Sequence, residues 1–173
     1  MRSAVVRTLG KIGRPTKEVV LFLIEEFRNQ QKTPRREAAI ALKEVGDSAI
    51  PYLIDALEDG QTEVCFYAAM ALGGVGPLAS EAVPYLIQVL KDQDVRAIAA
   101  WALGQIGPNA EDAVPDLIEA LGDSKFIIRN VSAEALGRIG PNAKLRFRVC
   151  RYIIGGNKGE KSSNHRGLWG LLS

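Results

Sequence analysis

The stretch "ALGQIGPNAEDAVPDLIEAL", from Ala102 to Leu121, decides the fold because variants of it recur along the chain. A leucine in front of a glycine-rich turn returns every 30 to 33 residues, at Leu9, Leu42, Leu72, Leu103 and Leu136. Each of these leucines is followed three residues later by Ile or Val and four residues later by glycine. Self-similarity at a fixed period of this size indicates a repeat protein.

Each repeat predicts two helices. The first begins at a proline, as in "AVPYLIQVLKD" (82–92), because the missing N–H of proline costs nothing in the first turn of a helix. The second is rich in alanine, as in "VRAIAAWALGQIG" (95–107), and its closing glycine is predicted to adopt a left-handed conformation. Short loops join the two helices, and Asp94 or Ser124 is predicted to cap the helix that follows.

Small residues, mostly alanine, stand one, three and four positions before the repeat leucine, as at Ala99, Ala100 and Ala102. Such residues let neighbouring helices approach closely, while the Leu and Ile/Val positions fill the space between layers. A single repeat cannot bury this face, whereas a stack of repeats can. The sequence therefore predicts an all-α fold built from stacked helix pairs.

The segment "DVRAIAAWALGQIGPNAEDAVPDLIEAL" (94–121) resembles the "VR…AA.ALG.IG…AVP.LI..L" pattern of the HEAT-like repeats first recognised in phycobilisome lyases. The resemblance covers about residues 1–143, which we expect to form one solenoid that starts in the middle of a repeat. It implies a right-handed α-α superhelix of about 4–5 antiparallel helix pairs, whose second helices line the concave surface. This fold serves many roles, so the resemblance is specific for structure and weak for function.

The repeat pattern breaks after "GRIGPNA" (137–143). Residues 144–173 hold seven Lys/Arg and one acidic residue, whereas residues 1–143 hold fifteen Lys/Arg and nineteen acidic residues. One interpretation is a divergent basic tail, with a short closing helix over 144–154 and a remainder too poor in apolar periodicity to fold alone. The other is a frameshift or a reading frame truncated from a longer array.

The composition argues against several classes of function. No uninterrupted apolar run approaches the roughly 20 residues that span a bilayer, so no membrane contact is expected. The two cysteines, Cys65 and Cys150, and the single histidine, His165, form no metal-binding or disulfide pattern, so we expect no metal, no cofactor and a cytoplasmic setting. An acidic body is poorly suited to binding nucleic acid.

An arginine stands seven residues before four of the five repeat leucines, and Cys65 interrupts the series. This arginine ladder consists of Arg2, Arg35, Arg96 and Arg129. It offers either a binding surface for acidic partners or a structural device in which each arginine pairs with a loop acid such as Asp92 or Asp123. We favour the structural interpretation, and the resemblance agrees, because this arginine belongs to the repeat pattern of the family.

A candidate partner-binding surface lies on the second helices, at the positions six, five and two residues before the repeat leucine. In the middle repeats these positions are large and apolar and form an apolar strip: Ile40, Phe66, Tyr67, Met70, Ile98 and Trp101. Polar residues flank the strip and form a polar rim: Arg7, Arg36, Glu37, Gln105, Glu134 and Arg138. An exposed apolar patch with a polar rim is typical of a partner site. The alternative is that these side chains only pack against adjacent repeats.

No arrangement of nucleophile and base is evident, and we assign no catalytic residue. We therefore predict a non-enzymatic scaffold that binds a segment of another protein on its concave, second-helix surface. The resemblance leaves open a bilin lyase-like chaperone or transferase. A third possibility is a fragment of a longer array that self-associates through uncapped ends.

Overall fold

The computed structural model describes residues 16–140. Within this range the regular structure is entirely helical, which confirms the predicted all-α repeat fold. Arg2, Arg7, Cys150, His165 and the predicted tail over 144–173 lie outside the described residues.

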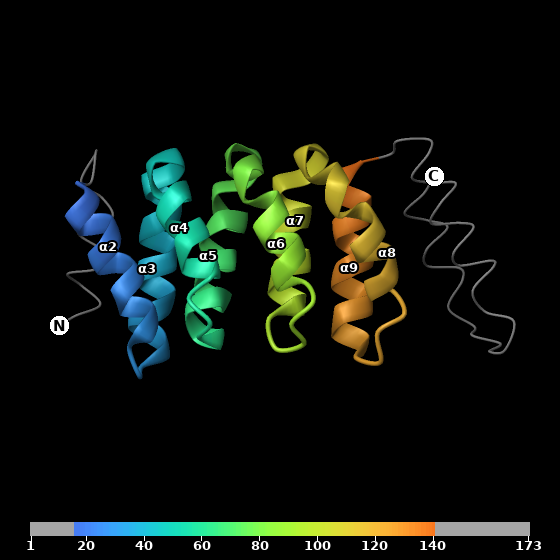
Figure 1. The fold of residues 1–173 in the computed structure, drawn as a ribbon, viewed down its shortest axis with the longest axis horizontal. Helices are drawn as coiled ribbons and strands as arrows, with labels where there is room; N and C mark the ends of the chain where they lie inside the picture. Colours follow the sequence, from blue (N-terminus) through green and yellow to red (C-terminus); the bar gives the residue numbers. More distant parts are fainter. Residues whose placement is uncertain (1–15, 141–173) are drawn as a thin grey trace, which may run out of the picture.

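The helices alternate between two layers. The first helices of the pairs are α2 (Lys17–Glu25), α4 (Ile50–Leu57), α6 (Val83–Val89) and α8 (Val114–Ala120). The second helices are α3 (Lys32–Val45), α5 (Thr62–Val75), α7 (Arg96–Ile106) and α9 (Phe126–Ile139). Four 3₁₀ segments complete the described chain: η1 (Glu26–Arg28), η2 (Gly46–Ala49), η3 (Gly76–Ala82) and η4 (Gly107–Ala113). Each second helix contacts the next, from α3 through α5 and α7 to α9, and Figure 1 shows the pairs side by side along the longest axis.

Prolines and glycines mark the helix ends as predicted. Proline occupies the first turn of α4, α6 and α8. The second helices α3, α5 and α7 end at Gly46, Gly76 and Gly107, whose φ angles are +74°, +75° and +72°. Their ψ angles lie between −136° and −138°, far from those of a left-handed helix, so the predicted left-handed conformation is wrong although the positive φ is confirmed. This combination is open to little besides glycine, and it turns the chain directly into the next 3₁₀ segment.

The prediction that Asp94 and Ser124 cap the second helices is wrong. Val95 stands at the N-cap of α7 and Lys125 at that of α9, and neither helix has a side-chain cap. Asp94 and Ser124 therefore stand one residue too early to reach the free N–H groups of the first turn. The loop before α7 is held instead by Asp92, whose Oδ1 accepts a hydrogen bond from the N–H of Asp94 at 3.0 Å.

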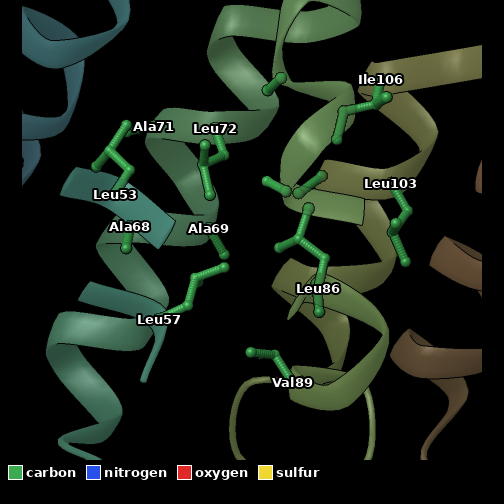
Figure 2. Close-up of a cluster of buried hydrophobic side chains, with 14 of the residues drawn as sticks. Leu53, Leu57, Ala68, Ala69, Ala71, Leu72, Leu86, Val89, Leu103 and Ile106 are labelled. Atoms are coloured by element: carbon green, nitrogen blue, oxygen red, sulfur yellow. The ribbon is translucent and has the colours of Figure 1, made fainter. Parts of the chain in front are cut away.

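The core runs continuously from repeat to repeat. Leu42, Leu72 and Leu103 on the second helices are fully buried, and so are Leu53 and Leu86 on the first helices. Figure 2 shows the leucines of α4 to α7 around the small side chains of α5. The small residues before Leu42, Leu72 and Leu103 are buried as well, as predicted. Each layer is therefore stabilised mainly by its neighbours.

Glycines that directly follow the repeat leucine bring the second helices into near contact. A Cβ atom placed on Gly104 would lie 2.8 Å from the Cα of Ala135, and one on Gly73 would lie 2.9 Å from the Cα of Ala102. Real Cβ atoms do not approach backbone this closely, so only glycine fits at both positions. The sequence prediction considered the small residues before the leucine and missed these two.

One segment, Thr62–Val89, is long and apolar enough to cross a bilayer by length and composition alone. In the structure it comprises α5, η3 and α6, and the positive φ of Gly76 separates the two helices. Leu72 and Leu86 within it are fully buried against neighbouring repeats. The apolar composition of this segment therefore matches its place in the core.

Candidate partner-binding surface

The six residues of the apolar strip fall into two groups. Ile40 on α3 and Phe66 on α5 are exposed, with 46% and 37% of their surface accessible. Tyr67, Met70, Ile98 and Trp101 are half-buried and pack against the core. The strip thus combines two accessible side chains with four that partly fill the contacts between repeats.

Aromatic side chains connect the strip to the core. Phe27 in η1, between α2 and α3, is fully buried and stacks on Tyr67, with ring centroids 5.8 Å apart. Tyr67 in turn meets Phe66 edge to face, at 5.2 Å between centroids. Edge-to-face and offset arrangements are the favourable ones for aromatic pairs. The exposed Phe66 is therefore positioned by rings that reach into the core.

Trp101 has a structural role beside any binding role. A Cβ atom on Gly73 would lie 2.5 Å from Cζ3 of Trp101, so the indole rests directly on the backbone of the preceding helix. The absence of a side chain at Gly73 leaves the space that the ring occupies. Replacing Trp101 would disturb the contact between α5 and α7 as well as the surface.

Three predicted rim residues form one network across α7 and α9. Arg138 donates a hydrogen bond to Oε1 of Gln105 at 2.9 Å and another to Oε1 of Glu134 at 2.7 Å. Two further rim residues lie on α3, where Arg36 is exposed and Glu37 is half-buried. Exposed ion pairs of this kind add at most about 1 kcal/mol to stability.

Arg96 shows what the ladder position does. Its Nε donates to the carbonyl of Leu90 at 2.8 Å, and its Nη2 donates to the carbonyl of Lys91 at 3.0 Å. Its Nη1 donates to Oδ2 of Asp123, in the loop of the following repeat, at 2.5 Å. One guanidinium group thus joins the end of its own first helix to the next loop.

The other described ladder positions contact loops in related ways. Arg35 donates to the carbonyl of Asn29 and lies 3.5 Å from a carboxylate oxygen of Glu63. Arg129 donates to the carbonyls of Asp123 and Ser124 at 2.9 and 2.8 Å. These guanidinium groups are therefore engaged within the chain.

Cys65 occupies the ladder position of the repeat between Arg35 and Arg96. Its buried thiol donates to the carbonyl of Leu57, with Sγ 2.9 Å from the oxygen. Burial, followed by the nearby charge of Asp92, raises the pKa of the Cys65 thiol. The protonated thiol is a poor nucleophile at neutral pH. Among residues 16–140, no group of three or more His, Cys, Asp and Glu side chains is placed to hold a metal ion.

The Asp123 ion pair predicts a pH dependence of stability. The backbone N–H of Lys125, and then Arg96, lower the pKa of the Asp123 carboxyl group. The stabilisation from a lowered pKa is complete above the usual value of about 3.9 and is lost as the pH falls through the folded-state value. We expect Asp123→Asn to lower the melting temperature at pH 7, and the difference from wild type to shrink below about pH 4.

Thermal melts of both proteins between pH 7 and pH 3 measure this difference. Asp94→Asn is the matched control, because it removes the same charge from a loop. Asp94 donates its backbone N–H to Asp92, and the substitution leaves this hydrogen bond in place. A difference between wild type and Asp123→Asn that stays constant down to pH 3 would contradict the role of this carboxylate.

The architecture defines a helical-repeat solenoid, and comparison with known families makes the assignment specific. The family of HEAT repeats matches residues 20–94 and 83–147. The chain therefore belongs to the HEAT-repeat family. A search of curated protein sequences finds no significant match.

Solved structures of similar fold confirm the resemblance seen in the sequence. The complex of CpcE and CpcF of phycocyanin lyase from Nostoc sp. PCC7120 matches with a TM-score of 0.74 and 19% identity, over 91% of this chain and 100% of that chain. A designed armadillo repeat protein in complex with the peptide (KR)4 matches with a TM-score of 0.62 and 16% identity, over 98% and 92%. The archaeal HEAT-like repeats protein from Thermococcus onnurineus NA1 matches at 0.50 and 14%, over 99% and 76%. At these identities the matches show a shared fold.

Proposed function

We propose that the chain is a non-enzymatic scaffold that binds a segment of another protein along its second-helix layer. The observation that carries this proposal is the exposure of Ile40 and Phe66 on the neighbouring helices α3 and α5. Large apolar side chains are costly to leave in water, and their burial contributes roughly 25 cal/mol for each Å² covered. A partner with apolar side chains at matching spacing would cover them.

The surroundings of Phe66 suit it to be a binding anchor. Its ring is positioned by Tyr67, which stacks on the buried Phe27, so little conformational freedom is left to lose on binding. Aromatic residues held in this way dominate many interfaces. The network of Arg138 with Gln105 and Glu134 offers polar groups that set the register of the bound segment.

The comparisons support a protein partner. CpcE and CpcF form a complex with each other, and the designed armadillo protein holds a peptide. Both structures show solenoids of this fold engaging another chain. The partner of the present chain is proposed on the same basis, as a segment that presents apolar side chains to the strip and polar groups to the rim.

The test compares surface variants that leave the core intact. We expect Ile40→Ser combined with Phe66→Ser to lower recovery of the partner from a native cell extract at least about tenfold, since two anchors are lost. Leu78→Ser is the matched control, because Leu78 is 66% exposed but lies in η3, away from the strip. Undiminished recovery by the double variant, with an unchanged circular dichroism spectrum, would overturn the proposal.

A second candidate is a bilin lyase-like chaperone or transferase. Its support is the similarity to the CpcE–CpcF complex of phycocyanin lyase along nearly the whole of this chain. Binding of a free bilin should shift and sharpen the long-wavelength absorption band of the pigment. An unchanged spectrum at micromolar protein would count against this role and leave the scaffold role in place.

A further inference from the structure

The ladder position at Cys65 leaves a set of acceptors without the guanidinium group that they meet elsewhere in the chain. In the next repeat Arg96 bridges the carbonyls of Leu90 and Lys91 to the carboxylate of Asp123. In the Cys65 repeat Asp92 keeps this register, since it follows Cys65 by 27 residues as Asp123 follows Arg96, while the loop before Cys65 is two residues longer than the loop before Arg96. The thiol of Cys65 supplies one hydrogen bond, to the carbonyl of Leu57.

The carboxylate of Asp92 is oriented by its loop in the same way as that of Asp123. Oδ1 of Asp123 accepts the N–H of Lys125 at 2.8 Å, which leaves Oδ2 for Arg96. Oδ1 of Asp92 likewise accepts the N–H of Asp94 at 3.0 Å. Within residues 16–140, no side chain donates a hydrogen bond to Oδ2 of Asp92. The carboxylate is thus oriented by its loop, with one oxygen left open.

A hollow of about 370 Å³ occupies this place between the two repeats. Its lining includes Leu57, Glu58, Cys65, Tyr85, Gln88 and Asp92. Two of these residues are acidic, and no lysine or arginine lines the hollow. Sites that take small organic groups have volumes of roughly 300–1,000 Å³, so the hollow is large enough for an arginine side chain.

We propose that this hollow binds a guanidinium group presented by another molecule, such as the arginine side chain of a partner. In this site the carboxylate of Asp92 takes the role of Asp123, and the carbonyl of Leu57 at the end of α4, which the side chain at position 65 reaches, takes the role of the carbonyls that Arg96 meets. A planar guanidinium with five donors matches acceptors on several sides, which a single ammonium point charge does not. The hollow shares no residue with the apolar strip, so this inference is independent of the proposed scaffold function.

The chemistry of Cys65 favours a cationic ligand. Because its thiol stays protonated, Cys65 adds no charge of its own, and the charge of the hollow comes from Asp92 and Glu58. Asp59, in the same loop, is already paired with Arg28. The acidic groups that remain to meet a ligand are therefore those that line the hollow.

The experiment uses the full chain labelled with ¹⁵N and follows amide shifts during titration. The probes are a capped glycine–arginine–glycine tripeptide, the matching citrulline tripeptide and agmatine. We expect the arginine tripeptide to shift amides over 57–65 and 88–95, with a dissociation constant on the order of 1 mM or below. The neutral citrulline tripeptide should cause no saturable shift. If the tripeptide binds more tightly than agmatine, the natural ligand is a partner's arginine. If agmatine binds more tightly, the ligand is a small guanidine. Either result supports a guanidinium site.

Two variants test the assignment of the acceptors. Cys65→Arg should fill the hollow from within, abolish tripeptide binding and raise the melting temperature, as expected for a restored ladder. Asp92→Asn should weaken binding at least about tenfold, because a charged hydrogen bond is lost. Asp94→Asn, with the same change of charge in the same loop, should bind like wild type. Absence of saturable shifts in wild type, or undiminished binding by Cys65→Arg or Asp92→Asn, would overturn the proposal.

Discussion

Gly104→Ala is expected to destabilise the protein by about 1–3 kcal/mol, although alanine is the better helix former. The new methyl group would lie 2.8 Å from the Cα of Ala135 and 3.0 Å from its Cβ. Backbone cannot turn aside as a flexible side chain can, so α7 and α9 would have to separate. Separation would weaken the contacts along both helices, which make up one of the main interfaces between repeats.

Gly137→Ala is the matched control for this prediction. Gly137 follows Leu136 as Gly104 follows Leu103, and it also lies in a second helix, but nothing lies within 4 Å of a Cβ placed there. The same substitution should therefore raise stability by up to about 1 kcal/mol through helix propensity. Urea denaturation of the two variants measures the contrast. Equal effects at both positions would show that the close approach of α7 and α9 does not limit the fold.

The sequence was sufficient for the architecture because the repeat appears in it several times. The leucines, the helix-starting prolines and the glycines at positive φ each occupy equivalent places in successive units, as at Pro84 and Gly107. These features act within one helix or one turn. Local chemistry therefore determines them, and the periodicity makes the pattern evident.

Features that depend on how one repeat meets the next were harder to predict. The cap of α7 is an exception, because it was predicted wrongly within a single loop, where Asp94 stands one residue too early and Asp92 holds the loop instead. Nothing in the sequence around Gly73 shows that Trp101 of the next repeat packs against it. A comparison of glycines one position after the repeat leucine, at Gly73 and Gly104, would have provided a signal for the close approach.

The candidate surface was predictable in composition but not in exposure. Helical spacing placed Phe66 and Trp101 on the same layer, yet one side chain is exposed and the other rests on a neighbouring helix. Trp101 is covered because Gly73, in the preceding repeat, has no side chain to hold the indole away. The hollow beside Cys65 follows the same logic, since it arises where a small residue interrupts a row of arginines.

Leu103→Ala is expected to cost about 2–5 kcal/mol, the largest effect among these substitutions. Leu103 is fully buried in α7, and α7 packs against both α5 and α9. Removing the side chain leaves a cavity in the middle of the stack, where contacts on both sides are lost. Leu78→Ala is the control, because Leu78 is 66% exposed and should change stability by no more than about 0.5 kcal/mol.

The location of the damage from Leu103→Ala distinguishes a solenoid from a protein with one central core. In a stack that is stabilised by nearest neighbours, the loss spreads from the altered layer and weakens with distance. Hydrogen exchange should therefore quicken most in α5, α7 and α9 and least in α3, two second helices away. An equal loss of protection in α3 would mean that the layers unfold as one cooperative unit. A loss of stability below about 1 kcal/mol would mean that the layer around Leu103 is not the core of the stack.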